Sequence, residues 1–92
     1  MAKKYENDKG FLIIEMSFEE ATTICNFGIE CDNCNSLLLL EDYVYYFAAL
    51  NRLFCKECCD DIIANQKRFK EDIPYEKRHY NHYAKKLNIE EV

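Results

Sequence analysis

Two cysteine pairs with the spacing C-x-x-C are the residues of this sequence best able to do chemistry. They are Cys31 with Cys34 and Cys55 with Cys58, and 20 residues lie between the pairs. Each pair can place two thiolates on one metal ion from a tight turn. Four soft sulfur ligands select zinc or iron over magnesium and calcium, and the sequence lacks the closely spaced cysteine runs of iron–sulfur clusters. The spacing therefore predicts one structural Zn²⁺ ion bound by these four residues.

A disulfide framework and redox chemistry are weaker interpretations of the six cysteines. Residues 1–10 are polar and charged rather than a cleavable secretory signal, so we expect a cytoplasmic protein with reduced thiols. A redox-active pair would open the helix of a βαβ unit, which neither pair does. Cys25 is expected on the apolar face of a helix, although it could replace a ligand. Cys59 directly follows Cys58 and either could reach the metal; the spacing favours Cys58.

The charge balance bears on the kind of partner. Twelve Lys and Arg residues against 17 Asp and Glu give a formal charge of −5, and four bound thiolates with one Zn²⁺ take it to −7. From Glu15 to Asp61, ten acidic residues are offset only by Arg52 and Lys56. Such a surface repels phosphates, so direct nucleic-acid binding by this region is not expected, whereas a basic protein surface would be attracted. No apolar run is long enough to cross a bilayer, the longest being residues 37–40.

The chain ahead of the first cysteine pair predicts a strand and a helix. Residues 11–16 are apolar and rich in β-branched side chains, which is typical of a short buried strand. Ser17 and Glu20 have the S-x-x-E spacing of a capping box, which starts a helix. Its apolar face would consist of Phe18, Ala21, Ile24 and Cys25. Gly28 can adopt the left-handed conformation that ends a helix.

Between the cysteine pairs, residues 37–54 predict a β-hairpin. Aromatic side chains follow a period of two along residues 43–48, as expected of a strand. Asn51 is the best candidate for a positive φ in a turn over residues 49–52, after which the chain pairs back and enters Cys55.

After Cys58 the apolar spacing becomes helical. The expected stripe is Cys59, Ile62, Ile63 and Phe69, with a possible extension to Ile73. Free N–H groups in the first turn of this helix can stabilise the thiolates of Cys55 and Cys58. Pro74 should break or kink the helix. Residues 74–92 predict a second amphipathic helix, whose apolar face would be Tyr80, Tyr83, Ala84 and Leu87.

The order of these elements resembles the treble-clef zinc fold. In that family a knuckle supplies two cysteines, a hairpin follows, and the first turn of a helix supplies the last two. The family's ligand positions correspond here to Cys31, Cys34, Cys55 and Cys58. In a zinc ribbon the second pair would lie on another hairpin, whereas residues 60–66 favour a helix. We therefore expect an α+β fold with a single domain over residues 1–92, a treble-clef-like Cys₄ module at 28–70 and a C-terminal helix at 74–92.

Three stretches also resemble small zinc proteins of phages and mobile elements. They are GIECDNCN at residues 28–35, ALNR at 49–52 and FCKEC at 54–58. Some small, acidic proteins of that kind are anti-CRISPR inhibitors of Cas nucleases, and this chain is similar in size, charge and lack of catalytic residues. The resemblance implies a protein that acts in the cytoplasm of a host cell.

The sequence lacks the residues of catalytic treble clefs. Those nucleases hold a second metal with a hairpin histidine, and no histidine lies between Cys31 and Cys58. Four thiolates also fill a tetrahedral zinc ion and leave no position for an activated water. His79 and His82 could contribute to a second metal, but without acidic or cysteine partners nearby in sequence we expect them to face solvent or a tyrosine. Neither an enzymatic activity nor a small-molecule substrate is predicted.

The leading hypothesis is a non-enzymatic zinc-binding inhibitor or adaptor that binds a basic, nucleic-acid-handling protein. By the resemblance, the partner would be a type II CRISPR–Cas effector nuclease whose DNA loading is blocked. So small a domain cannot bury every aromatic residue at positions 43–47, so some should line an exposed face. The residues expected to contact the partner are Glu41, Asp42, Tyr43, Tyr45, Asp60 and Asp61.

Two alternatives to this hypothesis remain. Basic clusters at residues 67–70, 77–78 and 85–86, interleaved with tyrosines, could form a zinc-finger nucleic-acid-binding or transcription-associated module. Acidic residues between those clusters favour a solvated helix face instead. The second alternative is a purely structural role in a larger assembly.

Overall fold

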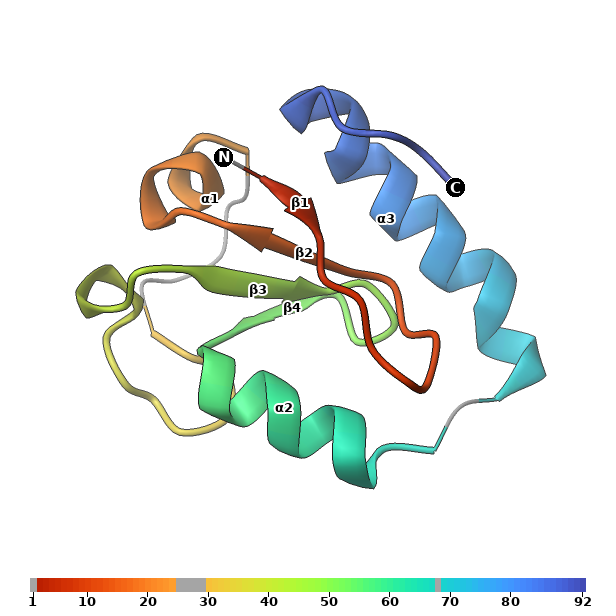
Figure 1. Cartoon of the computed structure of the whole chain (residues 1–92), viewed down its shortest axis with the longest axis horizontal. Helices are drawn as coiled ribbons and strands as arrows, with labels where there is room; N and C mark the ends of the chain where they lie inside the picture. Colours follow the sequence, from red (N-terminus) through yellow and green to blue (C-terminus); the bar gives the residue numbers. More distant parts are fainter. Residues whose placement is uncertain (1, 25–29, 68) are drawn as a thin grey trace.

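An antiparallel sheet of four strands forms the centre of the structure (Figure 1). The computed structural model describes residues 2–24, 30–67 and 69–92 of the chain. The strands are β1 (Lys3–Lys4), β2 (Ile13–Met16), β3 (Val44–Phe47) and β4 (Arg52–Phe54), and they lie side by side in that order. The helices are α1 (Phe18–Ile24), α2 (Lys56–Asn65) and α3 (Ile73–Leu87), with short 3₁₀ turns η1 (Leu38–Leu40) and η2 (Lys70–Asp72). The α+β class expected from the sequence is confirmed.

Helices cover both faces of this sheet. Tyr45 and Tyr46 are neighbours on β3, so their side chains point to opposite faces. On one face the ring of Tyr45 packs against Tyr5, whose hydroxyl donates a hydrogen bond to Asp60 of α2. On the other face the ring of Tyr46 packs against Tyr83 of α3. All four residues of β3 are consequently buried.

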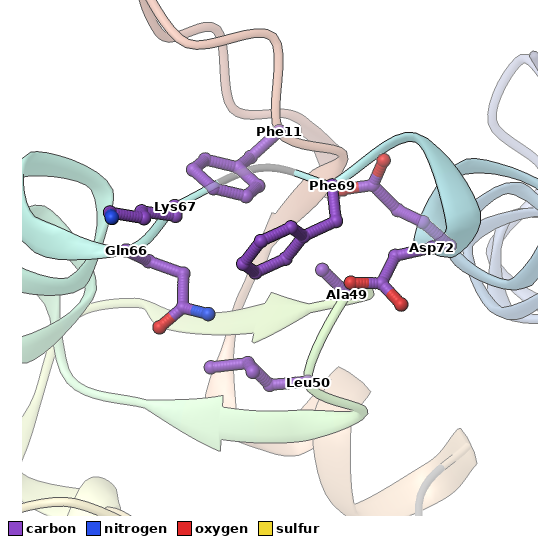
Figure 2. A pocket seen from close by; sticks show the side chains of 8 residues that line it. Phe11, Ala49, Leu50, Gln66, Lys67, Phe69 and Asp72 are labelled. Atoms are coloured by element: carbon purple, nitrogen blue, oxygen red, sulfur yellow. The ribbon is translucent and has the colours of Figure 1, made fainter.

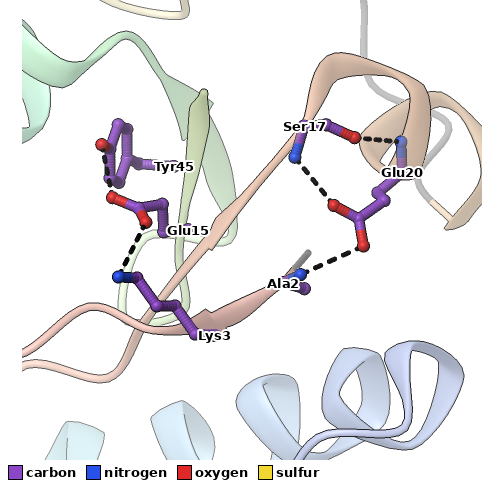
Figure 3. A network of polar contacts seen from close by, with 6 residues as sticks. All are labelled: Ala2, Lys3, Glu15, Ser17, Glu20 and Tyr45. Carbon is purple, nitrogen blue, oxygen red and sulfur yellow. Dashed lines mark hydrogen bonds and ion pairs between the residues drawn. The ribbon is translucent and has the colours of Figure 1, made fainter. Parts of the chain in front are cut away.

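Helix α1 starts where the capping box predicts. The Oγ of Ser17 accepts a hydrogen bond from the N–H of Glu20 at 3.1 Å, and a Glu20 carboxylate oxygen accepts one from the N–H of Ser17 at 2.9 Å (Figure 3). The other Glu20 oxygen accepts from the N–H of Ala2 at 3.1 Å, which ties the N-terminal segment to α1. Hydrogen bonds from Ser17 are the main reason that the pKa of the Glu20 carboxyl is lowered. The predictions for Cys25 and Gly28 concern residues outside the described part of the chain.

Strands β3 and β4 form the predicted hairpin. Tyr46 lies opposite Leu53 in the antiparallel pair, and Asn51 stands in the connecting turn with a φ of 55°. This is the positive φ expected at that position. Strand β2 pairs with the free edge of β3 and β1 pairs with β2, so the sheet extends beyond the hairpin. The sequence does not predict β1, because its two lysines carry no apolar pattern.

The C-terminal helices differ from the prediction in where one ends and the next begins. Helix α2 ends at Asn65, so Phe69 lies beyond it and is 51% exposed instead of joining the apolar stripe. Pro74 stands in the first turn of α3, where a missing N–H costs nothing, and does not interrupt a continuing helix. Helix α3 ends at Leu87, so residues 88–92 are not helical.

One core joins these elements. Its buried residues run from Ala2 to Ala84. The radius of gyration, 12.1 Å, is that of a compact folded chain of this length, for which roughly 12 Å is typical. Within the described ranges, none of the helices combines the length and the apolar character needed to cross a bilayer.

Candidate metal centre

The four predicted cysteines converge at one point of the structure. The Sγ atoms of Cys31, Cys34, Cys55 and Cys58 all lie within 4.8 Å of one another, and those of Cys34 and Cys55 are 3.9 Å apart. A tetrahedral zinc ion with Zn–S bonds of about 2.3 Å requires sulfur atoms about 3.8 Å apart. The donor set and its spacing therefore fit one four-coordinate zinc ion. Among the described residues, this is the one group of three or more His, Cys, Asp or Glu side chains that converge in this way.

A tight turn places the first pair. The N–H of Asn35 donates to the carbonyl of Cys31 at 3.0 Å, and Asn35 has a φ of 62°. Asparagine tolerates this left-handed conformation better than most residues, so the chain can reverse directly after Cys34. The turn is fixed to β4, because the N–H of Asp32 donates to the carbonyl of Leu53 at 3.1 Å and the Asp32 carboxylate accepts from the N–H of Leu53 at 3.3 Å. The sequence did not lead us to predict the roles of Asn35 and Asp32. The available signal was the asparagine that directly follows the C-x-x-C pair.

The junction of β4 and α2 places the second pair. Strand β4 ends at Phe54, Cys55 is the N-cap residue of α2, and Cys58 lies in the first turn. The first N–H groups of a helix lack partners within it and carry partial positive charge, which favours thiolates at this position. Burial opposes this effect and raises the pKa of Cys55, although the N–H of Cys58 lowers it. The N–H groups of Cys55 and Asn33 donate to the Sγ of Cys31 at 3.4 and 3.5 Å. Such hydrogen bonds orient a metal-binding sulfur and stabilise its negative charge.

The thiols of the cluster differ in exposure and in pKa. Cys34 is exposed and the other three are buried. The Sγ of Cys34 lies 3.1 Å from the Oγ of Ser36, and hydrogen bonds with Ser36 lower the pKa of Cys34 to about 6. A hydrogen bond with Asn33 lowers the pKa of Cys58, but burial and hydrogen bonds with the other thiols outweigh it and raise that pKa to about 12. Because the ligands are thiolates, a metal must displace protons from the buried thiols, and its affinity falls as the pH falls.

Cys59 lies in the core and not in the cluster. Its side chain is fully buried, and burial is the main cause that raises the pKa of its thiol to about 12. Cys58, and not Cys59, converges with the other three cysteines, as the C-x-x-C spacing predicts. The prediction for Cys25 lies outside the described residues.

The two histidines lie against tyrosines on α3. The Nδ1 atom of His79 is 3.2 Å from the carbonyl oxygen of Ala48, and its ring packs on Tyr75 with 4.1 Å between the ring centroids. The ring of His82 packs on Tyr83 at 4.9 Å. This is the environment that the sequence led us to expect for both residues.

The prediction that Tyr45 contacts a partner is wrong. Tyr45 is only 1% exposed, because its ring packs against Tyr5 and its hydroxyl donates to Glu15 at 2.8 Å (Figure 3). Glu15 in turn pairs with Lys3 of β1 at 3.6 Å. The small size of the domain led us to expect an exposed aromatic face on this strand, but α2 and the segment after β1 cover Tyr45.

The other predicted contact residues are exposed and lie in two places. Residues 41–43 directly precede β3, whereas residues 60–61 lie on α2. Asp60 pairs with Lys56 at 3.5 Å and accepts the Tyr5 hydroxyl at 2.7 Å, so its charge is partly engaged. The two carboxylates at positions 41 and 42 form no hydrogen bond or ion pair with any other described residue. They are therefore the stronger candidates for contacting a charged partner.

A pocket between the end of α2 and the start of α3 is too small for a substrate (Figure 2). The ring of Phe69 points into it, between Phe11 and the hairpin turn at Leu50. Its free volume is about 20 Å³, which is roughly the space of one water molecule. Glu76 at its edge accepts a hydrogen bond from the N–H of Leu12 at 3.2 Å, which joins α3 to the sheet. The pocket is a packing feature.

Comparison with known proteins gives no relative for this chain. No protein-family model, curated protein or solved structure matches it. What the chain does must therefore be inferred from its cysteine cluster and its exposed surface.

Proposed function

We propose that this chain is a non-enzymatic, zinc-stabilised binding module of the treble-clef type, and that its acidic surface binds a basic, nucleic-acid-handling protein. The order of knuckle, hairpin and helix supports the treble-clef assignment. So do the two hydrogen bonds between Asp32 and Leu53, which hold the knuckle against the second strand of the hairpin. The zinc ion would be held by Cys31, Cys34, Cys55 and Cys58.

The chemistry of the site supports a structural role for the metal. Four thiolates complete the coordination of a tetrahedral zinc ion and leave no position for substrate or activated water. The ion joins the knuckle to the start of α2, which are 20 residues apart in sequence. In a domain with so few residues, this link supplies part of the stability that a larger core would otherwise supply.

The observation that carries the binding function is the pair of exposed, unengaged carboxylates at Glu41 and Asp42 within the Cys₄ module. Other exposed acids of the same region add negative charge. They are Glu30, Asp32, Glu57 and Asp61. A zinc-loaded chain would carry a formal charge of −7, which attracts a basic surface and accelerates its encounter.

We propose a type II CRISPR effector nuclease as the first partner to test, on the strength of the sequence resemblance. Such nucleases hold their nucleic acids in positively charged channels. An acidic protein seated on that surface would exclude DNA by competition, or would hold a domain out of position. Inhibition would then require no catalytic residue in this chain.

The test is a pull-down of the purified nuclease, with and without guide RNA, by the zinc-loaded protein. We expect a complex at low salt that weakens as salt increases. The double variant Glu41→Lys/Asp42→Lys should lose the complex. The matched control Glu90→Lys/Glu91→Lys makes the same charge change in the C-terminal segment and should keep it. The absence of a complex at low salt, or equal binding by the two double variants, would refute the proposal.

Nucleic-acid binding through α3 is the runner-up. Its basic side chains are exposed, but Lys86 lies over the ring of Tyr83 at 5.6 Å and Arg78 over Tyr75 at 5.8 Å. Rings covered by the chain's own cations are poor platforms for stacked bases. An electrophoretic shift assay separates the two functions, because an acidic binding module should not retain DNA or RNA even at low salt.

A further inference from the structure

The loop before β3 exposes an unusual amount of apolar surface. Leu37, Leu39, Leu40 and Tyr43 are 41, 50, 76 and 44% exposed, and they are four of the seven large apolar residues that are exposed in the described chain. We name the surface formed by these four residues with Glu41 and Asp42 the η1 surface. In Figure 1 the loop lies at the left end of β3.

This loop is held in a defined shape. Leu38, in the middle of the run, is fully buried and anchors the loop in the core. The N–H of Leu40 donates to the carbonyl of Leu37 at 3.2 Å, and that of Glu41 to the carbonyl of Leu38 at 3.0 Å. An isolated bridge pairs Leu37 with Glu30. The apolar side chains are thus presented by an ordered turn, which lowers the entropic cost of binding a partner.

An acidic hollow of about 340 Å³ shares Glu41, Asp42 and Tyr43 with the η1 surface. Its lining residues are Glu15, Glu41, Asp42, Tyr43, Tyr45 and Lys56. Lys56 is paired with Asp60, and Glu15 is paired with Lys3, so these charges are already engaged. Glu41 and Asp42 have no such pair among the described residues and lie next to the exposed ring of Tyr43. Carboxylates beside an aromatic face favour a guanidinium or ammonium group.

We infer that the η1 surface is the docking site for the partner, and that the docking segment combines apolar side chains with at least one Arg or Lys. The cationic side chain would enter the hollow beside Glu41 and Asp42, while the apolar side chains cover the leucines. The inference rests on the proposed function, and it adds the location of the contact and the chemistry of the segment that makes it.

Charge favours a basic segment with apolar side chains over the other possible occupants of the η1 surface. A second copy of the chain, packed symmetrically on the same surface, would gather the carboxylates of residues 41–42 from both copies in one interface, where they repel one another. Anionic lipid and nucleic acid are repelled by the same carboxylates. A basic segment with apolar side chains satisfies both parts of the surface.

The test is a selection of random displayed peptides on the immobilised zinc-loaded protein, followed by affinity measurements on the enriched peptides. We expect enrichment of peptides in which Arg or Lys stands among apolar residues. Leu40→Ser, and separately Glu41→Lys/Asp42→Lys, should weaken their binding by at least about tenfold. The controls Val92→Ser and Glu90→Lys/Glu91→Lys change an exposed apolar residue and a pair of exposed acids elsewhere, and both should bind as wild type. Unchanged zinc content in each variant shows that the fold is intact.

Three results would overturn the inference. They are the absence of enriched peptides, enrichment of peptides that bind Leu40→Ser as tightly as wild type, and a wild-type dimer in sedimentation that Leu40→Ser dissociates. The same variants separate this inference from the proposed function. If the nuclease binds wild type and Leu40→Ser equally, the docking site is wrong and the proposed function stands. If the peptides bind as expected and the nuclease does not bind, the docking site stands and the partner is wrong.

Discussion

Replacing Cys58 or its neighbour Cys59 by alanine makes a matched pair of variants that tests the metal centre. The two residues are adjacent on α2 and both are buried. The Sγ of Cys58 lies in the four-cysteine cluster, whereas Cys59 packs in the core. Cys58→Ala should therefore damage the metal site, and Cys59→Ala should damage only packing.

The expected effects differ in size and in kind. Zinc binding to a structural site contributes roughly 10–16 kcal/mol at neutral pH. If the four ligands share this about equally, losing Cys58 costs on the order of 3 kcal/mol, or about a hundredfold in zinc affinity. Losing the buried sulfur of Cys59 should cost about 1 kcal/mol, as for a deleted methyl-sized group in a core, and lower the Tm by about 4–8 °C.

Zinc affinity is measured by competition with a chromophoric chelator, and Tm by circular dichroism in excess zinc and after chelation. Cys59→Ala should keep one tightly bound zinc and a cooperative melt. Cys58→Ala should lose zinc to the chelator at a concentration that leaves wild type loaded. Zinc loss from Cys59→Ala with retention in Cys58→Ala, or equal affinities in the two variants, would refute the assignment of the ligand.

Further predictions concern the turns and caps that position the site. Ser17→Ala removes half of the capping box and should lower the free energy of unfolding by about 1 kcal/mol with no loss of metal; an unchanged thermal melt would contradict this. The same variant keeps the N–H of Ser17, whose hydrogen bond is the largest cause that lowers the pKa of the Glu20 carboxyl, so this pKa, followed by NMR titration, should return only in part toward its ordinary value. The stabilisation from this carboxylate is complete above its ordinary pKa and is lost as the pH falls through the lowered value. A Glu20 carboxyl that titrates at its ordinary pKa in Ser17→Ala would count against the hydrogen bond from the backbone N–H. Asn51→Ala should cost about 1–3 kcal/mol in urea unfolding, since alanine is strained at a φ of 55° and the Tyr46 hydroxyl loses its acceptor. Asn51→Gly should cost less, and equal costs would show that the positive φ is unimportant.

Local chemistry made much of this structure predictable. The capping box of Ser17 and Glu20, the positive φ of Asn51 and the convergence of two C-x-x-C pairs each depend on residues a few positions apart, or on a ligand spacing that metal geometry dictates. A sequence shows such relations directly.

The features that the sequence did not predict depend on tertiary contacts. Strand β1 exists because its backbone pairs with β2, and its two lysine side chains give no sign of this. Tyr45 is buried because a helix and a returning segment happen to meet over it. The four leucines at positions 37–40 look like a core segment, yet a 3₁₀ turn buries only Leu38 and exposes the others. Burial of a short apolar run is decided by which face the rest of the chain covers.

The metal content of the purified protein tests the central claim most directly. Native mass spectrometry combined with elemental analysis gives both the number of ions per chain and their identity. We expect one zinc ion per chain, retained by the folded protein and lost when it unfolds in acid, because protonation removes the four thiolate ligands. A folded, stable protein that carries no metal after preparation in zinc-containing medium would contradict the claim that Cys31, Cys34, Cys55 and Cys58 form a structural zinc site.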